Sequence, residues 1–495
     1  MPSNVSLASA PGRAHSAQSL PRALFRTALL CAAGAGLLSS QYVAARELGS
    51  TFFVTELSII AATVVTLIGP SLSYALGDRL RGSDRLLQWW ALAALLIQLA
   101  LPFGIRALVG SLGASHPLWA AAITASAVAL LCGYYAFILP LYAEPASLPR
   151  LYAAELGGAL LTLLLLAVAP SYRLFLPFFL LLPVLIAWLT QRRLVALCTL
   201  LLAGAVSTQT ESLDRWASTH YYRHYHQLDA PRVIESVYSP YQRIDVVEAA
   251  ADTALYLDGV PFYRSGDLDS FNVFLAELPG SLLPKRGRAL VVGSGSFSSA
   301  ARLHRLGYRV TVIELDALVA KVGFHRFAHL HKLSPEMITL HIDDARRVLA
   351  THSDSYDLIV LDVPAPYRIA TALLHSPEFY RQVAARLTPT GVVALSLCDD
   401  LAGSLGKRIA ASAAQVFAEI MVVESSAVGL GVLYGGAQLP FSIQAAAEQL
   451  RARDPQGGQV TPDQLVRSQV LDADPLGPQD LLGVLLLSRQ VVQLP

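Results

Sequence analysis

The sequence predicts a multi-pass α-helical membrane domain, followed by a small β-rich lead-in and an α/β doubly wound domain. First, 54% of the 495 residues are hydrophobic and only 15% are charged, which is too apolar for an ordinary soluble protein. Second, residues 24–208 carry few charges, and residues 209–495 carry most of them. Third, short apolar runs alternate with helical patterns after residue 285, which is typical of a mostly parallel sheet.

We divide the chain into five parts from these changes in composition. Residues 1–22 are rich in Ser, Ala and Pro and are expected to be a disordered tail. Residues 23–208 are the membrane domain, with about seven helices. A connector and β-rich part occupies 209–284, a Rossmann-like nucleoside-binding domain 285–440, and a helical or loop tail 441–495.

Seven apolar stretches each approach the ~20 residues that a helix needs to cross a bilayer. They span residues 23–44, 51–76, 86–109, 118–141, 151–169, 172–189 and 194–206. The last two fit least well, because Pro177 and Pro183 interrupt one and the other is short.

The connector and lead-in follow these stretches. Residues 207–231 form a polar connector with an aromatic and basic cluster, which we interpret as an interfacial belt where the chain leaves the membrane. Short strands are expected at 233–235, 243–248 and 254–257, with a turn at Asp258-Gly259. A helix is expected over residues 271–283.

A nucleotide-binding unit spans Arg288 to Asp316. Ala289–Val292 reads as a buried strand that breaks into the glycine turn at Gly293 and Gly295. A helix and a second strand follow, and that strand stops at Glu314, about twenty residues after the glycines, where an acid can accept from ribose hydroxyls. A serine stands at the third glycine position, so a smaller adenosine-bearing ligand fits better than a dinucleotide. The alternative is an ordinary doubly wound turn without a ligand.

Acids also follow two later strands of the predicted sheet. The strand at 338–342 runs into Asp343, and the strand at 356–361 ends at Asp362. Helices are expected at 345–351 and at 376–387, the latter closed by Pro389 and Gly391, before a strand at 392–397. Since ligands of such sheets bind beyond the carboxyl ends of the strands, Glu314, Asp343 and Asp362 should converge on one edge.

Charge and cysteine content exclude other classes of function. A net charge of +1 gives no case for a nucleic-acid partner. Four cysteines offer neither a disulfide framework nor the spacing of a metal site.

Residues 233–435 resemble the spermidine/spermine synthase family, the polyamine aminopropyltransferases. The matching pieces are SVYSPYQRIDVVE, LYLDGVPFYRSGD, LVVGSGS, VIELD, IDDARRVL, YDLIVLDVPAP and SPEFYRQVAARLTPTGVVALS. The apolar half, including LYAAELGGALLTLLL, is similar to the membrane-bound bacterial branch. The resemblance implies a Rossmann-like, methyltransferase-type fold and transfer of an aminopropyl group from decarboxylated S-adenosylmethionine to an amine, without a metal.

The resemblance also implies the roles of particular residues. Asp362 matches the catalytic acid that accepts the proton of the attacking amine. Glu314 matches the ribose-binding acid, Asp343 the acid near the adenine amino group, and Gln242 a glutamine that contacts the nucleoside.

The remaining matched positions are the glycine turn and two weaker substrate contacts. Gly293 and Gly295 belong to the loop that approaches the cosubstrate, which is decarboxylated S-adenosylmethionine or S-adenosylmethionine. Asp267 matches an acid of the first flexible segment, and Asn272 is a mild departure from the family's residue.

The acceptor side departs from the family pattern. Ser296 stands where the family has the aspartate that holds the donor's ammonium, and Ala365 where a second aspartate holds the diamine. Phe262 replaces a glutamine, and Phe271 replaces a tyrosine. Since charge-assisted hydrogen bonds are worth ~1.5–3 kcal/mol each, putrescine is a doubtful acceptor, and a less charged small-molecule amine fits better.

Three functions remain open at this stage. The first is a membrane-anchored aminopropyltransferase-like enzyme. The second is an S-adenosylmethionine-dependent methyltransferase or lyase on the same fold, and the third is a non-catalytic nucleoside-binding membrane protein. A homodimer is compatible with each of them.

The charge pattern conflicts with the expected location in the cell membrane. Arginines precede the first apolar stretch and follow the second, fourth and sixth, so the positive-inside rule places the N-terminus in the cytoplasm. Seven crossings would then place the synthase-like domain outside, although its cosubstrate is made inside. We expect the domain to be cytoplasmic, with one of the two proline-rich or short stretches not crossing.

Overall fold

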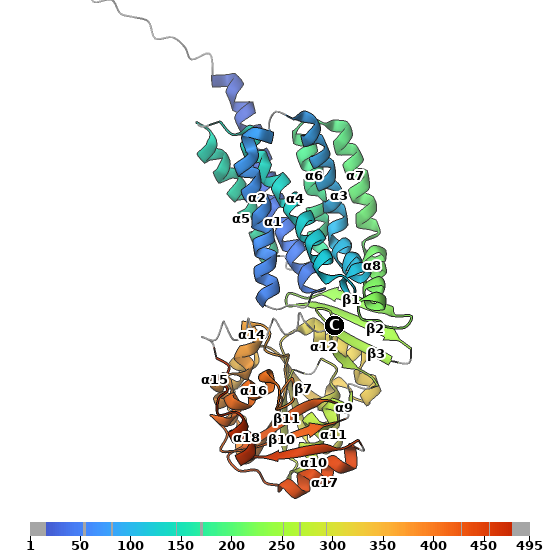
Figure 1. The fold of residues 1–495 in the computed structure, drawn as a ribbon, viewed down its shortest axis with the longest axis vertical. Helices are drawn as coiled ribbons and strands as arrows, with labels where there is room; N and C mark the ends of the chain where they lie inside the picture. Colours follow the sequence, from blue (N-terminus) through green and yellow to red (C-terminus); the bar gives the residue numbers. More distant parts are fainter. Residues whose placement is uncertain are drawn as a thin grey trace, which may run out of the picture. The chain divides into compact units, whose positions relative to one another are not determined.

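The computed structural model describes residues 16–477 apart from 53–55, 81–82, 145, 169–171, 251, 267–268, 294, 427 and 455. The chain divides into two compact units, one comprising residues 1–47 and 61–221 and the other residues 48–60 and 222–495 (Figure 1). The expected disordered tail falls mostly outside the described residues, but helix α1 already begins at Ser16.

The first unit is built of long helices. They are α1 (Ser16–Gly49), α2 (Glu56–Leu80), α3 (Asp84–Leu108), a π-helical turn (Val109–Gly113), α4 (Pro117–Tyr142), α5 (Leu148–Val168), α6 (Tyr172–Leu189), α7 (Arg193–Thr208) and α8 (Thr210–His224). Each of the seven predicted apolar stretches is helical over most of its described residues. Within the described residues, five helices are long and apolar enough to cross a membrane, or six if the pair α7 and α8, bent by 62°, counts as one.

Small residues let the helices of this unit approach closely. A Cβ on Gly158 of α5 would lie 1.8 Å from the carbonyl oxygen of Cys31 in α1. A Cβ on Gly69 of α2 would lie 2.0 Å from the carbonyl oxygen of Ala129 in α4. Backbones that pack this tightly are typical of helices that associate without a hydrophobic driving force.

The helix α6 continues through Pro183 because another helix satisfies the carbonyl group that the proline leaves unpaired. Pro183 has no N–H to donate to the carbonyl oxygen of Phe179. The side-chain amide of Gln98 in α3 donates to that oxygen at 2.5 Å, and Gln98 accepts from the hydroxyl of Tyr135 in α4 at 2.5 Å. This buried polar chain ties together three helices.

The second unit begins with a four-stranded antiparallel sheet in the order β1-β2-β3-β4. Its strands are β1 (Arg232–Tyr238), β2 (Arg243–Ala249), β3 (Asp252–Leu257) and β4 (Val260–Arg264). The predicted turn between β3 and β4 is confirmed, since Asp258 and Gly259 both have positive φ, at 50° and 77°. The expected interfacial belt is wrong for Tyr222, which is buried in α8 and donates to Asp245 at 2.8 Å.

The main sheet has eight strands in the order β12-β10-β11-β9-β8-β5-β6-β7. They are β5 (Arg288–Gly293), β6 (Arg309–Glu314), β7 (Ile338–Ile342), β8 (Tyr356–Asp362), β9 (Leu387–Ser396), β10 (Glu419–Ser425), β11 (Leu430–Gly436) and β12 (Gly458–Pro462). The pairs β7–β6, β6–β5, β5–β8 and β8–β9 are parallel, and β11, β10 and β12 add antiparallel pairs.

Helices cover both faces of this sheet. They are α9 (Asp269–Asn272), a π-helical turn (Val273–Glu277), α10 (Leu278–Leu282), α11 (Ser298–Arg305), α12 (Ala317–Arg326), α13 (Ala345–Thr351), α14 (Ile369–Ala372), α15 (Pro377–Ala384), α16 (Ser404–Ala414), α17 (Ile443–Arg453) and α18 (Asp463–Gln469), with short 3-10 turns at Ala328–His331, Pro335–Met337 and Leu373–His375. The doubly wound prediction is confirmed by this arrangement.

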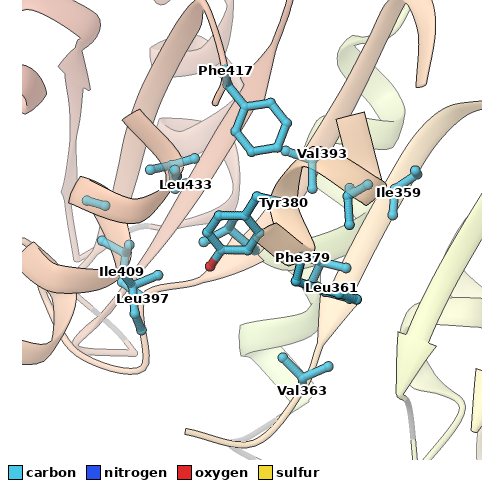
Figure 2. Packing of buried hydrophobic residues seen from close by; sticks show 14 of the residues in the cluster. Ile359, Leu361, Val363, Phe379, Tyr380, Val393, Leu397, Ile409, Phe417 and Leu433 are labelled. Carbon is cyan, nitrogen blue, oxygen red and sulfur yellow. The ribbon is translucent and has the colours of Figure 1, made fainter. Parts of the chain in front are cut away.

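Alternate residues of β8 divide between two hydrophobic clusters. Leu358 and Val360 join the cluster formed with α10, α11 and α17, whereas Ile359 and Leu361 join the one formed with α13, α15 and α16. Tyr380 of α15 lies at the centre of the second cluster, surrounded by side chains from neighbouring strands and α16 (Figure 2). A strand that is apolar on both faces reads as a continuous hydrophobic run, which explains the strong sequence signal of β8.

Three sequence expectations need correction. The helix over 271–283 is divided into α9, a π-helical turn and α10, because Pro279 cannot continue the α-helical bonding and Leu278 donates to Val273. The helix α15 ends at Ala384, and Pro389 and Gly391 lie in β9, where the pairing with β8 is irregular. The tail after residue 440 contributes β12, a short polar edge strand that lacks a hydrophobic pattern.

We predict that Gly158→Ala destabilises the first unit, because the added methyl group would collide with the backbone of α1. Gly157→Ala is the matched control, since nothing lies within 4 Å of its added Cβ. The melting temperature in detergent should fall for Gly158→Ala and stay equal or rise for Gly157→Ala, which gains up to ~1 kcal/mol of helix propensity. Equal melting temperatures for both variants would contradict the close packing of α1 and α5.

Candidate active site

The carboxyl ends of four neighbouring parallel strands bring the predicted site residues to one edge of the main sheet. Gly293 at the end of β5 pairs with Asp362 at the end of β8. On the other side of β5, Glu314 ends β6, and its carbonyl oxygen accepts from the backbone N–H of Asp343 at 3.0 Å. The sequence correctly placed these three acids along a single edge.

The glycine turn allows the end of β5 to approach Asp362. Gly293 has φ of +80°, and a Cβ there would lie 2.1 Å from the carbonyl oxygen of Asp362. A Cβ on Gly295 would lie 2.9 Å from Val319 and 3.4 Å from Phe262, so the turn also packs against α12 and the small sheet. Any larger residue at Gly293 would strain the backbone and separate β5 from β8.

Asp362 has a partly buried carboxyl group that accepts a hydrogen bond from Ser299. Burial raises its pKa to about 6, and a hydrogen bond from Ser299 partly opposes that shift. The hydroxyl of Ser299 lies 3.4 Å from Asp362 Oδ2 and 2.9 Å from Asn272 Oδ1. A carboxyl group that gains and loses a proton near neutral pH is suited to acid–base chemistry.

Glu314 is also buried, with 9% of its surface exposed. Burial raises its pKa to about 7, and the negative charges of Asp316 and Asp362 act in the same direction. The backbone N–H of Asp316 donates to Glu314 Oε1 at 3.0 Å. The side-chain amide of Gln242 reaches Asp316 Oδ2 at 3.4 Å, which brings this residue of the lead-in to the end of β6.

Asp343 differs from the other two acids because its partly exposed carboxylate is paired with an arginine. Its carboxylate accepts from Arg347 Nε at 2.8 and 3.0 Å and from the backbone N–H of Asp344 at 2.7 Å. The hydrogen bonds from Arg347 hold the pKa of Asp343 below its usual range. A nucleoside contact at Asp343 would therefore compete with Arg347.

The positions that depart from the family pattern are largely enclosed. Ser296 is buried, and its hydroxyl accepts from the backbone N–H of Ser298 at 3.3 Å within the glycine turn. Ala365 is partly buried against the hydrophobic cluster of α15, and Phe271 against that of α11. Asp267 lies outside the described residues.

Sequence reasoning gave no role to Ser299, which contacts Asp362, or to His375, which contacts the segment that follows it. Ser299 was considered only as a substitute for a glycine, although its hydroxyl contacts the acid. His375 is buried, and its Nε2 lies 3.0 Å from the carbonyl oxygen of Pro364, while the Tyr380 hydroxyl lies 3.3 Å from Nδ1. Burial lowers the pKa of His375 to about 4, so a neutral imidazole fixes the segment that follows Asp362. The contact between Ser299 and Asp362 has no sequence signal, because the two residues are 63 positions apart in the chain.

The described residues include no group of three or more His, Cys, Asp or Glu side chains that could hold a metal ion.

The strand order and the acidic edge define a Rossmann-like α/β domain of the methyltransferase type. The sequence profile of the family described as "Spermine/spermidine synthase domain" matches residues 269–425. Residues 269–425 are therefore similar to the spermine/spermidine synthase domain, and the chain spans less than two thirds of the length of the curated relatives that it matches.

Individual relatives match only parts of the chain. It is 28% identical over 167 residues to a "Polyamine aminopropyltransferase" of Leptospira biflexa, which covers 33% of this chain and 59% of that protein. It is 28% identical over 203 residues to "Polyamine aminopropyltransferase 2" of Ralstonia nicotianae, covering 39% and 38% respectively. The crystal structure of a probable spermidine synthase from Corynebacterium glutamicum overlaps with 18% identity and a TM-score of 0.40, covering 49% of this chain and 95% of that one. That overlap is too weak to carry an argument, and the fold assignment rests on the strand order.

We predict that Glu314→Gln stabilises the protein more at high pH than at low pH. The raised pKa means that the folded state holds a proton that the unfolded state has released between the ordinary value of 4.5 and about 7. Stability from the protonated carboxyl is therefore present below pH 4.5 and is lost as the pH rises through 7. The difference in melting temperature, variant minus parent, should grow by a few degrees from about pH 5 to about pH 8. The exposed Glu448→Gln in α17 is the control, and a similar trend there would remove the case for Glu314.

Proposed function

We propose that this protein is a membrane-anchored, spermidine synthase-like aminopropyltransferase. It would transfer an aminopropyl group from decarboxylated S-adenosylmethionine to an amine and release methylthioadenosine. The observation that carries the proposal is the partly buried Asp362, whose pKa is raised to about 6, at the end of β8 beside the glycine turn and near the buried acid Glu314. The match of residues 269–425 to the spermine/spermidine synthase domain supports it.

In the proposed reaction, Asp362 acts on the attacking amine. The amine nitrogen forms a bond to the carbon next to the sulfonium as that carbon–sulfur bond breaks, and the electron pair goes to sulfur. The thioether leaves without charge, so it needs no acid to assist it. The nitrogen loses one proton, which a deprotonated Asp362 accepts. Glu314, Gln242 and the glycine turn would hold the nucleoside and fix the reacting carbon beside the amine.

The acceptor is proposed to carry less positive charge than putrescine. A diamine needs a carboxylate at each end, and the site has uncharged residues at Ser296 and Ala365. The Ser296 hydroxyl is bonded within its own turn, and Ala365 packs against the core. A monoamine has only one ammonium group, so it would not need the second carboxylate that this site lacks.

The main alternative is an S-adenosylmethionine-dependent methyltransferase or lyase. An uncharged Ser296 would not repel a donor that retains its carboxylate, which specifically favours this alternative. The product separates the two reactions, because methyl transfer releases S-adenosylhomocysteine and aminopropyl transfer releases methylthioadenosine. Binding of methylthioadenosine without turnover of any donor would favour a non-catalytic nucleoside-binding protein.

The first unit is proposed to span the cell membrane. Leucines of α5 and α7 are exposed over large fractions of their surface, for example Leu161 at 60% and Leu201 at 66%, as expected of side chains that face lipid. If α7 and α8 form one span, the described residues hold six helices that are long and apolar enough to cross, and an even number of crossings would place both ends of this unit on the same side. Six crossings would agree with both the charge rule and a cytoplasmic cosubstrate.

We predict that Asp362→Asn lowers the rate of methylthioadenosine release by ~10²–10⁴-fold, since it removes the proton acceptor. The assay supplies decarboxylated S-adenosylmethionine with monoamines and with putrescine. Binding of methylthioadenosine, followed by calorimetry, should be retained, because the nucleoside contacts are unchanged. The control is Asp472→Asn, which alters an exposed acid. No release by the parent with any amine would refute aminopropyl transfer.

We predict that the second unit resists added protease in sealed right-side-out vesicles and is cleaved in inverted ones. Both results are expected if the chain crosses the membrane an even number of times, because the second unit then lies in the cytoplasm. Cleavage in right-side-out vesicles alone would place the domain outside and contradict the proposed cosubstrate.

A further inference from the structure

The hydroxyl of Ser299 lies between an amide and the carboxyl group of Asp362. Ser299 is fully buried in the first turn of α11, and Asn272 at the end of α9 is 6% exposed. The Ser299 oxygen lies 2.9 Å from Asn272 Oδ1 and 3.4 Å from Asp362 Oδ2. Two separate elements, α9 and β8, therefore each present an oxygen to the same hydroxyl.

A serine hydroxyl has one proton to donate and two lone pairs that accept. It cannot donate to both oxygens at once. When Asp362 is charged, the stronger bond is the charge-assisted one, from Ser299 to the carboxylate. When Asp362 is protonated, its own O–H can donate to the Ser299 oxygen, and Ser299 can then donate to Asn272. The Ser299 hydroxyl can therefore form a hydrogen bond with Asp362 in both of its protonation states, with Asn272 accepting from Ser299 when Asp362 is protonated.

We propose that Ser299 is the positioning residue of Asp362 and that Asn272 is the alternative acceptor that lets Ser299 turn as Asp362 changes its protonation state. This inference rests on the proposed function, in which Asp362 gains a proton from the amine and loses it in every turnover. The proton moves from the amine nitrogen to Asp362, and Ser299 keeps its own proton throughout. The hydroxyl reorients and leaves both states of the carboxyl group hydrogen-bonded in the same place.

Other titratable groups also act on this site. The charge of Asp362 acts on Glu314 at the end of β6 and on Cys398 beyond β9, and those groups are influenced in turn by Asp316 and Asp399. Burial raises the pKa of the Cys398 thiol to about 12, so it stays protonated. Since Glu314 titrates near 7, the measurement must report on aspartate carboxyl groups alone.

The test is a carbon-13 NMR titration of the full chain in detergent, labelled at the aspartate side-chain carboxyl carbons. The Asp362 signal is assigned by its loss in Asp362→Asn. Ser299→Ala should raise the pKa of Asp362 by about half a unit to one unit, because the carboxylate loses its charge-assisted donor. Asn272→Leu should lower the pKa of Asp362. Without Asn272, Ser299 has no alternative acceptor for its own proton, so the arrangement in which protonated Asp362 donates to the Ser299 oxygen is destabilised. Ser299→Thr, which keeps a hydroxyl, should restore the parent value.

Opposite shifts in the two variants are the supporting result, because a merely structural role would not give them. Shifts of the same sign, or none, would overturn the proposal. Ser412→Ala in α16 is the control, since its buried hydroxyl donates to the carbonyl oxygen of Arg408 and it should leave Asp362 unchanged. Asn272→Ala serves as a second variant that adds no bulk.

The titration requires no catalysis, so it separates this inference from the proposed function. If aminopropyl transfer is detected, the acid limb of the kcat profile should move to higher pH in Ser299→Ala and to lower pH in Asn272→Leu. If no transfer is found with any amine, the proposed function fails, while the NMR shifts still decide the role of Ser299.

Discussion

The pairing of Gly293 with Asp362 is the contact on which the site depends. Parallel pairing puts the ends of β5 and β8 side by side, and the left-handed conformation of Gly293 turns the chain away directly after that pair. A Cβ would have no space, because the carbonyl oxygen of Asp362 lies 2.1 Å from where it would stand. The glycine therefore sets the distance between the loop that would receive the nucleoside and the acid that would receive the proton.

The three acids at this edge of the sheet differ in how their surroundings change their pKa values. Glu314 is buried and Asp362 is partly buried, and the pKa of each is raised because a charged carboxyl is poorly solvated there. Asp343 is also partly exposed, but it is paired with Arg347, which keeps it charged. One edge of the sheet thus holds two acids that titrate near neutral pH and one that remains ionised, which separates groups fit for proton transfer from a group fit for fixed binding.

The segment after Asp362 is held by neutral contacts. His375 links Tyr380, which lies inside the hydrophobic cluster of α15, to the carbonyl group of Pro364. Since the imidazole is neutral, it fixes this segment without adding a positive charge that would draw the proton away from Asp362. Ala365, which we propose lies on the acceptor side, is therefore part of a segment anchored to the core.

Hydrophobic pattern and glycine position were enough to determine the fold class, the strands β5 to β8 and the acids at their ends. These signals are local: a buried strand is an apolar run, and a tight turn needs glycine. The strand β12, the division of the 271–283 helix and the place of Pro389 within β9 were not predictable, because pairing with distant strands or the loss of one N–H decides them. Only the tertiary structure brought Ser299, Asn272 and Asp362 together from three elements and exposed Asp343 to Arg347, since burial and hydrogen-bond partners follow from packing across the chain.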